Sequence, residues 1–226
     1  MKLTIVMPVL NEAAAIAAAA GAARAELAPG DELLVVDGGS GDGTAALAAA
    51  AGAVVVASER GRGRQMNAGA AAGHGDVLLF LHADTTLPRG FRPELEGLIA
   101  AGVRWGHFDI EFDEGGPLLR LIARLISNRS RIMRSATGDQ AIFVVRSEFD
   151  VVGGYRERHL FEDVDLARRL RERSQPAIPR SRVVTSSRRW RNRGVWGTTL
   201  RMWTLKSLYL AGVRAETLER FYGDER

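Results

Sequence analysis

Short apolar runs alternate with Ala-rich stretches through the first part of the sequence. Continuous apolar runs of this length predict strands that are buried on both faces. They lie at residues 3–9, 32–37, 53–58 and 76–82. The stretches between them predict helices because Ala is the strongest helix former, and Asn11 is the expected N-cap of the first. These stretches lie at residues 11–27, 44–51 and 62–73. Strands that alternate with helices form a mostly parallel central sheet with helices on both faces, so the sequence predicts an α/β domain.

The pattern changes after Pro88. Residues 105–113 alternate between apolar and polar side chains, which predicts a half-exposed and often antiparallel strand. Another buried strand is expected at 139–146, and helices are expected at 88–101, 118–128 and 161–173. From Pro179 the chain becomes strongly basic, and residues 194–213 are amphipathic. We therefore predict one domain at residues 1–178 and a basic, helical C-terminal extension at 179–226 that packs on it.

The composition fits a globular protein. The 226 residues are enough for one sizeable domain, and 46% of them are hydrophobic. No apolar run reaches the roughly 18 residues that a membrane-spanning helix needs, and we find no signal-peptide pattern. The absence of cysteine excludes disulfides and thiolate metal sites. We expect a cytoplasmic protein.

Positive charge is concentrated in two parts of a chain whose net charge is only +4. Between Arg168 and Lys206, twelve Lys and Arg residues stand against one acid, Glu172. Residues 117–138 have no acid but carry five arginines: Arg120, Arg124, Arg129, Arg131 and Arg134. Such regions favour anionic partners, which include phosphates, nucleic acids and acidic membrane surfaces. A solvated Arg-rich surface is the alternative.

Polar groups follow three of the predicted strands. Asn11 and Glu12 follow the first, a Gly-rich turn from Asp37 to Thr44 follows the second, and His82 and Asp84 follow the fourth. Ligands of open α/β sheets bind beyond the carboxyl ends of the strands. Each group alone has a structural explanation: Asp37 is a turn residue, and Asp42 is a helix N-cap. Together they indicate a ligand site at this edge of the sheet.

Six segments carry a resemblance to a known family. They are VMPVLNEA, VVDGGSGDGT, GRGRQMNAGA, LHADTTLP, TGDQAIFV and FEDVDLARRL. In order and spacing the chain resembles the family 2 glycosyltransferases of GT-A fold over about residues 1–175. The resemblance implies an inverting transfer of a sugar from a nucleotide-diphosphate donor to an acceptor hydroxyl. The segments GRGRQMNAG, LHADT and RRWRNRGVW further resemble a small subgroup associated with arsenosugar biosynthesis and radical-SAM gene clusters.

The resemblance also implies where a UDP- or GDP-sugar binds. The positions that match the donor site are Pro8, Asn11, Glu12, Asp37, Asp42, Arg64 and Asp84. Asp84 takes the place of the last acid of a D-x-D motif, which holds Mn²⁺ or Mg²⁺. His82 stands where many relatives have Asp. It is either a second metal ligand, which would favour Mn²⁺, or a residue that hydrogen-bonds a sugar hydroxyl or a neighbouring loop.

By the same resemblance, Glu162 and Asp163 hold the catalytic base, usually the Asp. A carboxylate at this place can take the proton of the attacking hydroxyl. The structural alternative is a favourable interaction with the N-terminal end of a helix. The positions that match the acceptor side are Gly138, Asp139, Gln140, Arg189 and Trp190, although the Gln of the Q-x-x-R-W motif is absent.

Two other functions remain open. A sugar-phosphate nucleotidyltransferase would need a Gly-rich phosphate loop after the first strand, where this chain has Asn11-Glu12-Ala13. A non-catalytic module that binds RNA or acidic lipid explains neither Asp84 nor the Glu162–Asp163 pair, so we expect no nucleic-acid partner. Beyond residue 194, aromatic residues lie among basic ones. They predict either peripheral contact with the inner membrane face or packing within the core or a homodimer.

Overall fold

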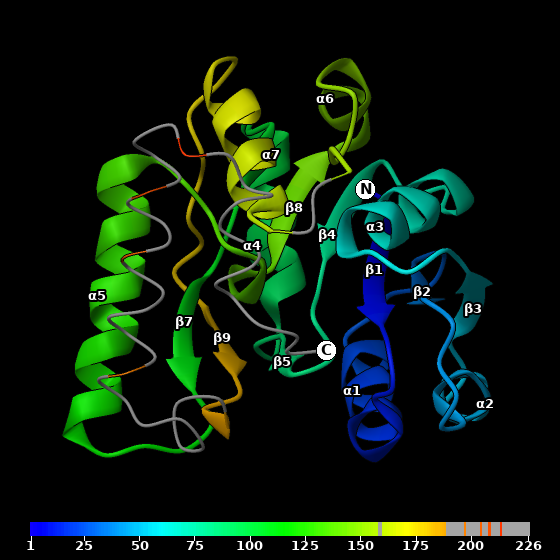
Figure 1. Ribbon diagram of the computed structural model, residues 1–226. Coiled ribbons are helices and arrows are strands. Elements are labelled where there is room, and N and C mark those ends of the chain that lie inside the picture. The colour runs from blue at the N-terminus through cyan, green and yellow to red at the C-terminus, as the bar shows by residue number, and fades with distance from the viewer. Residues whose placement is uncertain (158–159, 189–196, 198–203, 205–207, 209–212, 214–226) are drawn as a thin grey trace.

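The computed structural model describes residues 1–157, 160–188, 197, 204, 208 and 213. Strands and helices alternate up to residue 80, and helices cover both faces of the sheet (Figure 1). The strands are β1 (Leu3–Val9), β2 (Glu32–Asp37), β3 (Val54–Ala57), β4 (Val77–Phe80), β5 (Thr85–Thr86), β6 (Trp105–Gly106), β7 (Asp109–Phe112), β8 (Ile142–Val145) and β9 (Arg182–Thr185). The helices are α1 (Ala13–Ala25), α2 (Thr44–Ala50), α3 (Arg62–Ala72), α4 (Phe91–Ala100), α5 (Pro117–Met133), α6 (Arg146–Val151) and α7 (Glu162–Arg171), with a 3-10 turn η1 (Gly138–Gln140).

The main sheet has six strands in the order β3-β2-β1-β4-β8-β6. β1 pairs in parallel with β2 and with β4, and β2 pairs in parallel with β3. β8 runs antiparallel to both of its neighbours, β4 and β6. The sheet is therefore mixed, with β8 as the one reversed strand, and the predicted α/β fold is confirmed.

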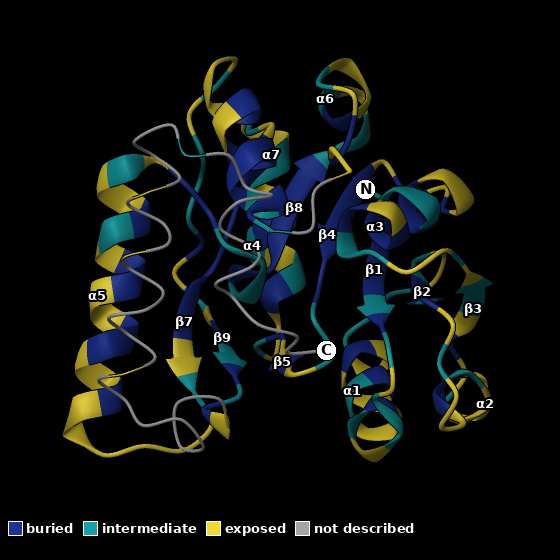
Figure 2. Ribbon diagram, viewed as in Figure 1, coloured by how far each residue is buried: buried dark blue, intermediate teal, exposed yellow. Residues whose placement is uncertain are grey.

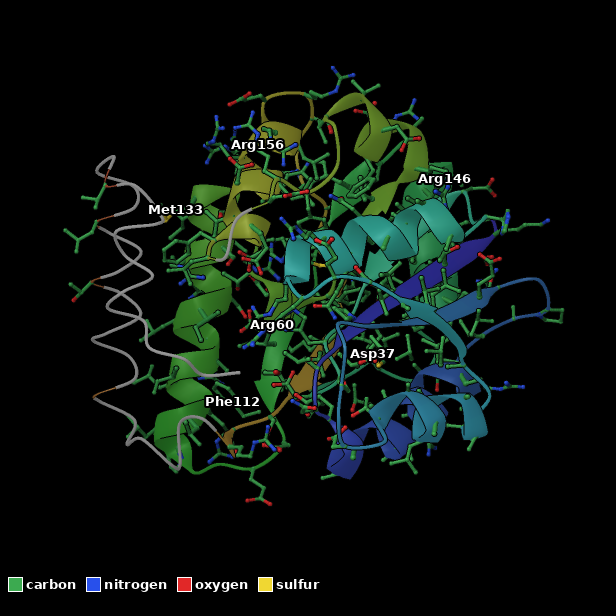
Figure 3. The ribbon with its side chains drawn as sticks, turned by 45° about the vertical axis from the view of Figure 1, so that its right-hand side comes forward. Asp37, Arg60, Phe112, Met133, Arg146 and Arg156 are labelled. Carbon is green, nitrogen blue, oxygen red and sulfur yellow. The ribbon has the colours of Figure 1, made fainter. Side chains whose placement is uncertain are left out.

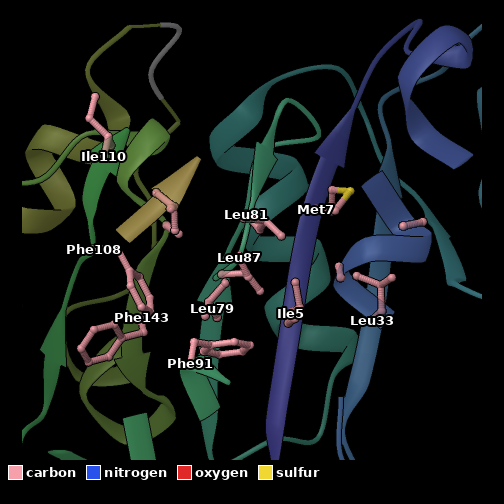
Figure 4. Packing of buried hydrophobic residues seen from close by; sticks show 14 of the residues in the cluster. Ile5, Met7, Leu33, Leu79, Leu81, Leu87, Phe91, Phe108, Ile110 and Phe143 are labelled. Atoms are coloured by element: carbon pink, nitrogen blue, oxygen red, sulfur yellow. The ribbon is translucent and has the colours of Figure 1, made fainter. Parts of the chain in front are cut away.

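Alternate residues of the strands point into two separate cores because strand side chains alternate between faces. Leu3, Ile5 and Met7 of β1 pack with residues of α1, α2 and α4. Val6 of the same strand packs with residues of α3, α6 and α7 on the other face. The first core continues through Phe91 and Phe143 to Phe108 and Ile110 (Figure 4). The helices bury the side that faces the sheet and expose the other (Figure 2).

A second, three-stranded sheet in the order β5-β9-β7 stands beside the main one. β9 pairs antiparallel with β5 and parallel with β7. Figure 1 shows β7 and β9 side by side, next to the long helix α5. Leu119 and Ile122 of α5 pack into the first core together with Ile110 of β7. This small sheet therefore joins α5 to the body of the molecule.

Several local features differ from expectation. Glu12 rather than Asn11 is the N-cap of α1, and Asn11 adopts a left-handed conformation with φ of 54° one residue earlier. The expected strand at 105–113 is divided into β6 and β7, which belong to different sheets. β5, α6 and β9 were not expected from the sequence.

The segment after Pro179 also differs where the structure describes it. Residues 182–185, expected to be part of a helical extension, form strand β9 of the small sheet, so the folded domain continues at least that far. The rest of the extension lies almost wholly outside the described residues, and its helical structure stays a prediction. None of the helices that the structure describes is long and apolar enough to cross a membrane.

Candidate active site

The carboxyl ends of β1 and β4 lie next to each other at one edge of the main sheet. Val6 of β1 is in register with Phe80 of β4, so Asn11 and Glu12 leave the sheet beside His82 and Asp84. From β1 the chain adds β2 and β3 on one side of the sheet and then returns to add β4 on the other. Such a reversal of strand order is where open α/β sheets bind ligands. The structure therefore brings together the strand ends that the sequence singled out.

The ends of β1 and β2 are tied together by hydrogen bonds. Ser40 Oγ accepts the backbone N–H of Asn11 at 2.8 Å, and Asn11 Oδ1 accepts that of Gly41 at 3.0 Å. The Asp37 carboxylate accepts the N–H of Ser40 at 3.1 and 3.2 Å, as well as its hydroxyl. Figure 3 labels Asp37 at the end of β2. Asp37 thus closes the turn, and its predicted contact with the donor stays a prediction, as does that of Pro8 within β1.

Asp42 is engaged by the starts of two helices. Its carboxylate accepts the backbone N–H of Thr44 at 3.0 Å, the Thr44 hydroxyl at 2.5 Å and the N–H of Ala13 at 3.0 Å. The hydrogen bond from the Thr44 hydroxyl, followed by that from Ala13, lowers the pKa of Asp42. Asp42 is not the helix N-cap that the sequence predicted, because Gly43 is the N-cap of α2, but its contacts anchor the starts of α1 and α2. Its contact with a donor stays a prediction.

Glu12 lies in an electrostatic group with Asp84, Asp42 and Arg188. Burial is the largest cause that raises the pKa of Glu12, and the carboxylates of Asp84 and Asp42 raise it further. The Arg188 guanidinium opposes this effect. Three carboxylates thus meet one guanidinium here, so the charges of these four groups leave a net negative charge. This end of the site is therefore suited to a cation.

A hard divalent cation fits the residues at this end. Asp84 is exposed and accepts one long hydrogen bond, from the Thr85 hydroxyl at 3.3 Å. Among the described residues, no group of three or more His, Asp or Glu side chains is arranged so that it could hold a metal ion by itself. Mg²⁺ and Mn²⁺ accept oxygen ligands from one or two carboxylates together with substrate phosphates and water. The donor set therefore fits an ion that binds together with a diphosphate.

His82 and Asp163 meet at the turn η1. The His82 ring lies so close to Gly138 that a Cβ atom on Gly138 would stand 2.4 Å from its Cε1 and 2.5 Å from its Nε2. On the same residue, the backbone N–H of Gly138 donates to Asp163 Oδ2 at 2.5 Å. His82 thus lies against a neighbouring loop, and both its hydrogen bond to a loop or sugar hydroxyl and its ligation of a metal stay predictions. Gly138 brings the end of β4 and the start of α7 together.

The acids at the start of α7 are held from several directions. Glu162 is buried and forms an ion pair with Arg62 at 3.5 Å. Asp163 Oδ1 accepts the backbone N–H of Val164 at 2.7 Å, while Oδ2 accepts Gly138. Asp163 therefore has a fixed orientation at the start of α7.

The predicted acceptor side is built on η1 and α5. Gln140 is fully buried, and its Oε1 accepts the Ser130 hydroxyl of α5 at 2.8 Å. Its Nε2 donates to the carbonyl of Phe108 at 3.3 Å. Gln140 is thus a structural link rather than a group open to substrate. Asp139 is half-buried and lies in the field of Arg129, which reaches the site from α5.

Arg64 is paired with protein carboxylates. It forms ion pairs with Glu59 at 2.5 Å and Glu157 at 2.8 Å, and these acids raise the pKa of its guanidinium. A contact with the nucleobase or diphosphate would require these exposed pairs to open, and it stays a prediction. Arg189 and Trp190 lie outside the described residues, as do the aromatic residues expected at a membrane or dimer surface.

Four residues at the site were not singled out from the sequence: Arg62, Gln65, Arg129 and Arg188. Gln65 Nε2 donates at 2.8 Å to the carbonyls of both Val9 and Val36, which joins the ends of β1 and β2 under the site. Arg129 and Arg188 belong to the two basic regions of the sequence, where the positive charge alone does not indicate which arginine lies at the site. No sequence signal distinguishes Gln65, because its role depends on two carbonyls from distant strands.

The fold has known counterparts among solved structures. A mycobacterial protein aligns at 23% identity and a TM-score of 0.60, over 82% of this chain and 65% of that one. Glucosyl-3-phosphoglycerate synthase from Mycobacterium tuberculosis, in complex with Mg²⁺ and uridine-diphosphate, aligns at 24% identity and a TM-score of 0.59, over 82% of this chain and 69% of that one. S. aureus TarS, in complex with UDP-GlcNAc, aligns at 15% identity and a TM-score of 0.67, over 82% of this chain and 58% of that one.

At these identities the likeness shows the fold, and the predicted GT-A fold is confirmed. The chain spans between 58% and 69% of the length of these proteins. No match was found among curated proteins. A protein-family model described as Glycosyl transferase family 2 matches residues 4–149, which include β1 to β8 and the ends of β1, β2 and β4. Since this match covers well over half of the 226 residues, the chain belongs to glycosyl transferase family 2.

Proposed function

We propose that this family 2 member is an inverting, metal-dependent glycosyltransferase that moves a sugar from a nucleotide-diphosphate donor to an acceptor hydroxyl. One observation carries the proposal: two groups of carboxylates lie near the contact between His82, which follows β4, and Gly138 of η1. Glu12 and Asp84 form one group, where charge favours a cation. Asp163 belongs to the other, where Gly138 fixes its carboxylate at 2.5 Å.

The first group would bind the donor. Asp84 would hold Mn²⁺ or Mg²⁺, with His82 as the second candidate ligand, and Arg188 adds a positive charge for the diphosphate. When bound, such an ion stabilises the negative charge of the departing diphosphate. The structures similar to this chain include proteins in complex with uridine-diphosphate or UDP-GlcNAc, which favours UDP over GDP as the nucleotide.

The second group would activate the acceptor. Asp163 accepts the proton of the acceptor hydroxyl while the oxygen of that hydroxyl forms a bond to the anomeric carbon of the donor sugar. The bond from that carbon to the diphosphate breaks, and the nucleotide diphosphate leaves with the bonding electrons. One displacement on the face opposite the leaving group inverts the anomeric centre. The chain contains no cysteine, and this route needs no covalent enzyme intermediate.

Two finer assignments rest on sequence motifs. GRGRQMNAG, LHADT and RRWRNRGVW support placement in the subgroup associated with arsenosugar biosynthesis. The basic and aromatic residues after 194 support contact with an acidic membrane surface or, alternatively, packing in a homodimer.

A donor screen tests the proposal. The purified full chain is incubated with UDP- and GDP-sugars, with Mn²⁺, with Mg²⁺ or with EDTA. We expect one donor to raise the melting temperature in the presence of metal and to release its nucleotide diphosphate slowly by hydrolysis. EDTA should abolish both effects.

The products separate the proposal from its competitors. A sugar-phosphate nucleotidyltransferase would instead produce pyrophosphate from a nucleoside triphosphate and a sugar phosphate. A binding module for RNA or acidic lipid would show salt-sensitive binding of those ligands without a response to any nucleotide-sugar. If no nucleotide-sugar stabilises the protein or is cleaved, the proposed function is wrong.

A further inference from the structure

Arg129 occupies an unusual position on α5. It lies in the second half of this helix, next to Ser130, whose hydroxyl is bonded to Gln140 of η1 at 2.8 Å. The helix is also held to α7, because Arg171 donates to the carbonyl of Met133 at 2.6 Å. These two links fix Arg129 beside the turn and the helix that carry Asp139 and Asp163.

The Arg129 guanidinium is largely withdrawn from water. Burial lowers its pKa, and the carboxylates of Asp139 and Asp163 oppose that shift. Both acids are therefore close enough to interact with it electrostatically. Its Nε is buried and has no hydrogen-bond partner among the described residues. A buried hydrogen-bond donor without an acceptor is unfavourable. If Arg129 only balanced the charges of two carboxylates, the burial of Nε without an acceptor would have no explanation.

Arg129 does not belong to the donor end of the site. The charged neighbours that influence Glu12 are Arg188, Asp84 and Asp42, whereas those that influence Arg129 are Asp139 and Asp163. The two sets have no residue in common. A diphosphate bound near Asp84 would thus meet Arg188, and Arg129 would meet whatever lies against Asp163.

We infer that Arg129 binds a carboxylate or phosphate of the acceptor, so that the acceptor of this enzyme is an anionic molecule. This inference rests on the proposed function, because Asp163 marks the acceptor side only if it is the base. Nε and one Nη of a guanidinium form a fork that matches two oxygens of such a group. The bare Nε supplies one arm of that fork.

The surroundings of Arg129 favour an anion in a second way. Residues 117–138 contain five arginines and no acid. Of these, Arg131 is paired with Asp109 at 2.6 Å. The positive charge of the other four arginines would raise the local concentration of anions. It would thereby offset the repulsion of anions by the carboxylates of Asp139 and Asp163.

Binding of small probes tests the inference without turnover. The full chain is loaded with nucleotide diphosphate and Mg²⁺ and titrated with glycerate, glycerol 3-phosphate and neutral glycerol, with calorimetry as the measurement. We expect the protein to bind one anionic probe at least tenfold more tightly than glycerol. The comparison of glycerate with glycerol 3-phosphate distinguishes a carboxylate site from a phosphate site.

Variants of two arginines on α5 locate the binding. Arg129→Met should weaken binding of the preferred anion at least tenfold, and Arg129→Lys should restore part of it. Arg124→Met is the matched control, because Arg124 is exposed on the same helix and its loss removes the same charge, and it should weaken binding far less than Arg129→Met. Thermal unfolding checks that each variant is folded.

Two results would overturn the inference: no preference for an anion over glycerol in the wild type, or equal anion binding by wild type and Arg129→Met. If the chain binds no nucleotide diphosphate at all, the proposed function itself fails. That outcome is distinct, because loading with nucleotide is measured before any probe is added.

Discussion

At the scale of single residues, two aspartates carry the proposed chemistry in different surroundings. Asp84 is exposed beyond the end of β4 and lies in the field of Glu12. Asp163 is held by two backbone N–H groups, from Gly138 and Val164, at 2.5 and 2.7 Å. An exposed carboxylate is free to change its ligands, whereas a fixed one has a defined direction for a proton. The two positions therefore suit a metal ligand and a base respectively.

Asparagine at each position should separate the two roles. Asp163→Asn should lower the rate of transfer about 100-fold or more, because a general base contributes roughly 10²–10⁴-fold, while nucleotide affinity stays near that of the wild type. Asp84→Asn should weaken the metal-dependent binding of nucleotide. Rates of product formation and nucleotide affinities with and without Mn²⁺ measure these effects.

Asp150→Asn serves as the control, since Asp150 is exposed on α6. Transfer at the wild-type rate by both site variants would show that the chemistry lies elsewhere, even with the fold unchanged.

At the scale of elements, α7 holds the proposed base in place through a buried ion pair. Asp165 is 1% exposed and pairs with Arg169 one turn later at 2.9 Å. Arg169 also donates to the carbonyls of Val152 and Gly154 at 2.5 and 2.8 Å. The loop before α7 is thus fixed to the helix. This link adds to the hydrogen bond between Gly138 and Asp163, which joins η1 to the start of α7.

Arg169→Met should lower the free energy of unfolding by about 3 kcal/mol, because it leaves Asp165 buried with a weaker set of partners. Arg168 also approaches Asp165, at 3.4 Å, but its side chain is 46% exposed. Arg168→Met should therefore cost less than about 1 kcal/mol. Urea unfolding compares the two variants, and equal losses would contradict the central role of Arg169.

The sequence predicted an element well where the residues of that element alone carry the pattern that identifies it. The runs at 3–9 and 32–37 coincide with β1 and β2, because a buried strand is apolar along its length. β5 has two residues and β9 has four, and both exist because they pair with segments far away in the chain.

The same limit applies to the site. The polar residues that follow the apolar runs predicted the groups at the ends of β1, β2 and β4. The contribution of Arg188 and Gln65 depends on contacts that no local pattern records.

At the scale of the whole molecule, a buried polar network joins the two sheets. His107 lies between β6 of the main sheet and β7 of the small one and is fully buried. Its Nδ1 lies 3.2 Å from Gln140 Nε2 and 3.1 Å from the carbonyl of Phe108. Through Gln140 the network reaches Ser130 on α5. One imidazole thus stands where both sheets and α5 meet.

The network should make stability depend on pH. Burial lowers the pKa of His107 below 6.5, although Asp109 and Asp139 partly oppose it and Arg131 adds to it. As the pH falls below 6.5, His107 therefore binds a proton in the unfolded chain before it does so in the folded protein. The free energy of unfolding should fall as the pH decreases from 6.5, by at most about 1.4 kcal/mol per pH unit for this group.

Urea unfolding between pH 7.5 and 5.5 measures the slope. His107→Gln should flatten it, whatever its effect on stability at pH 7.5. His74→Gln is the control, because the His74 side chain is 85% exposed. An unchanged slope in His107→Gln would show that other groups cause the pH dependence.

The reversed direction of β8 has a consequence for how such an enzyme can change. Because β8 runs against β4, the turn before it arrives at the same edge as the residues that leave β4. Apart from Arg188, the proposed donor groups that the structure describes lie before residue 85, and the proposed acceptor groups that it describes lie between residues 129 and 163. One contiguous stretch could thus be exchanged in evolution to alter the acceptor while the nucleotide half is inherited intact.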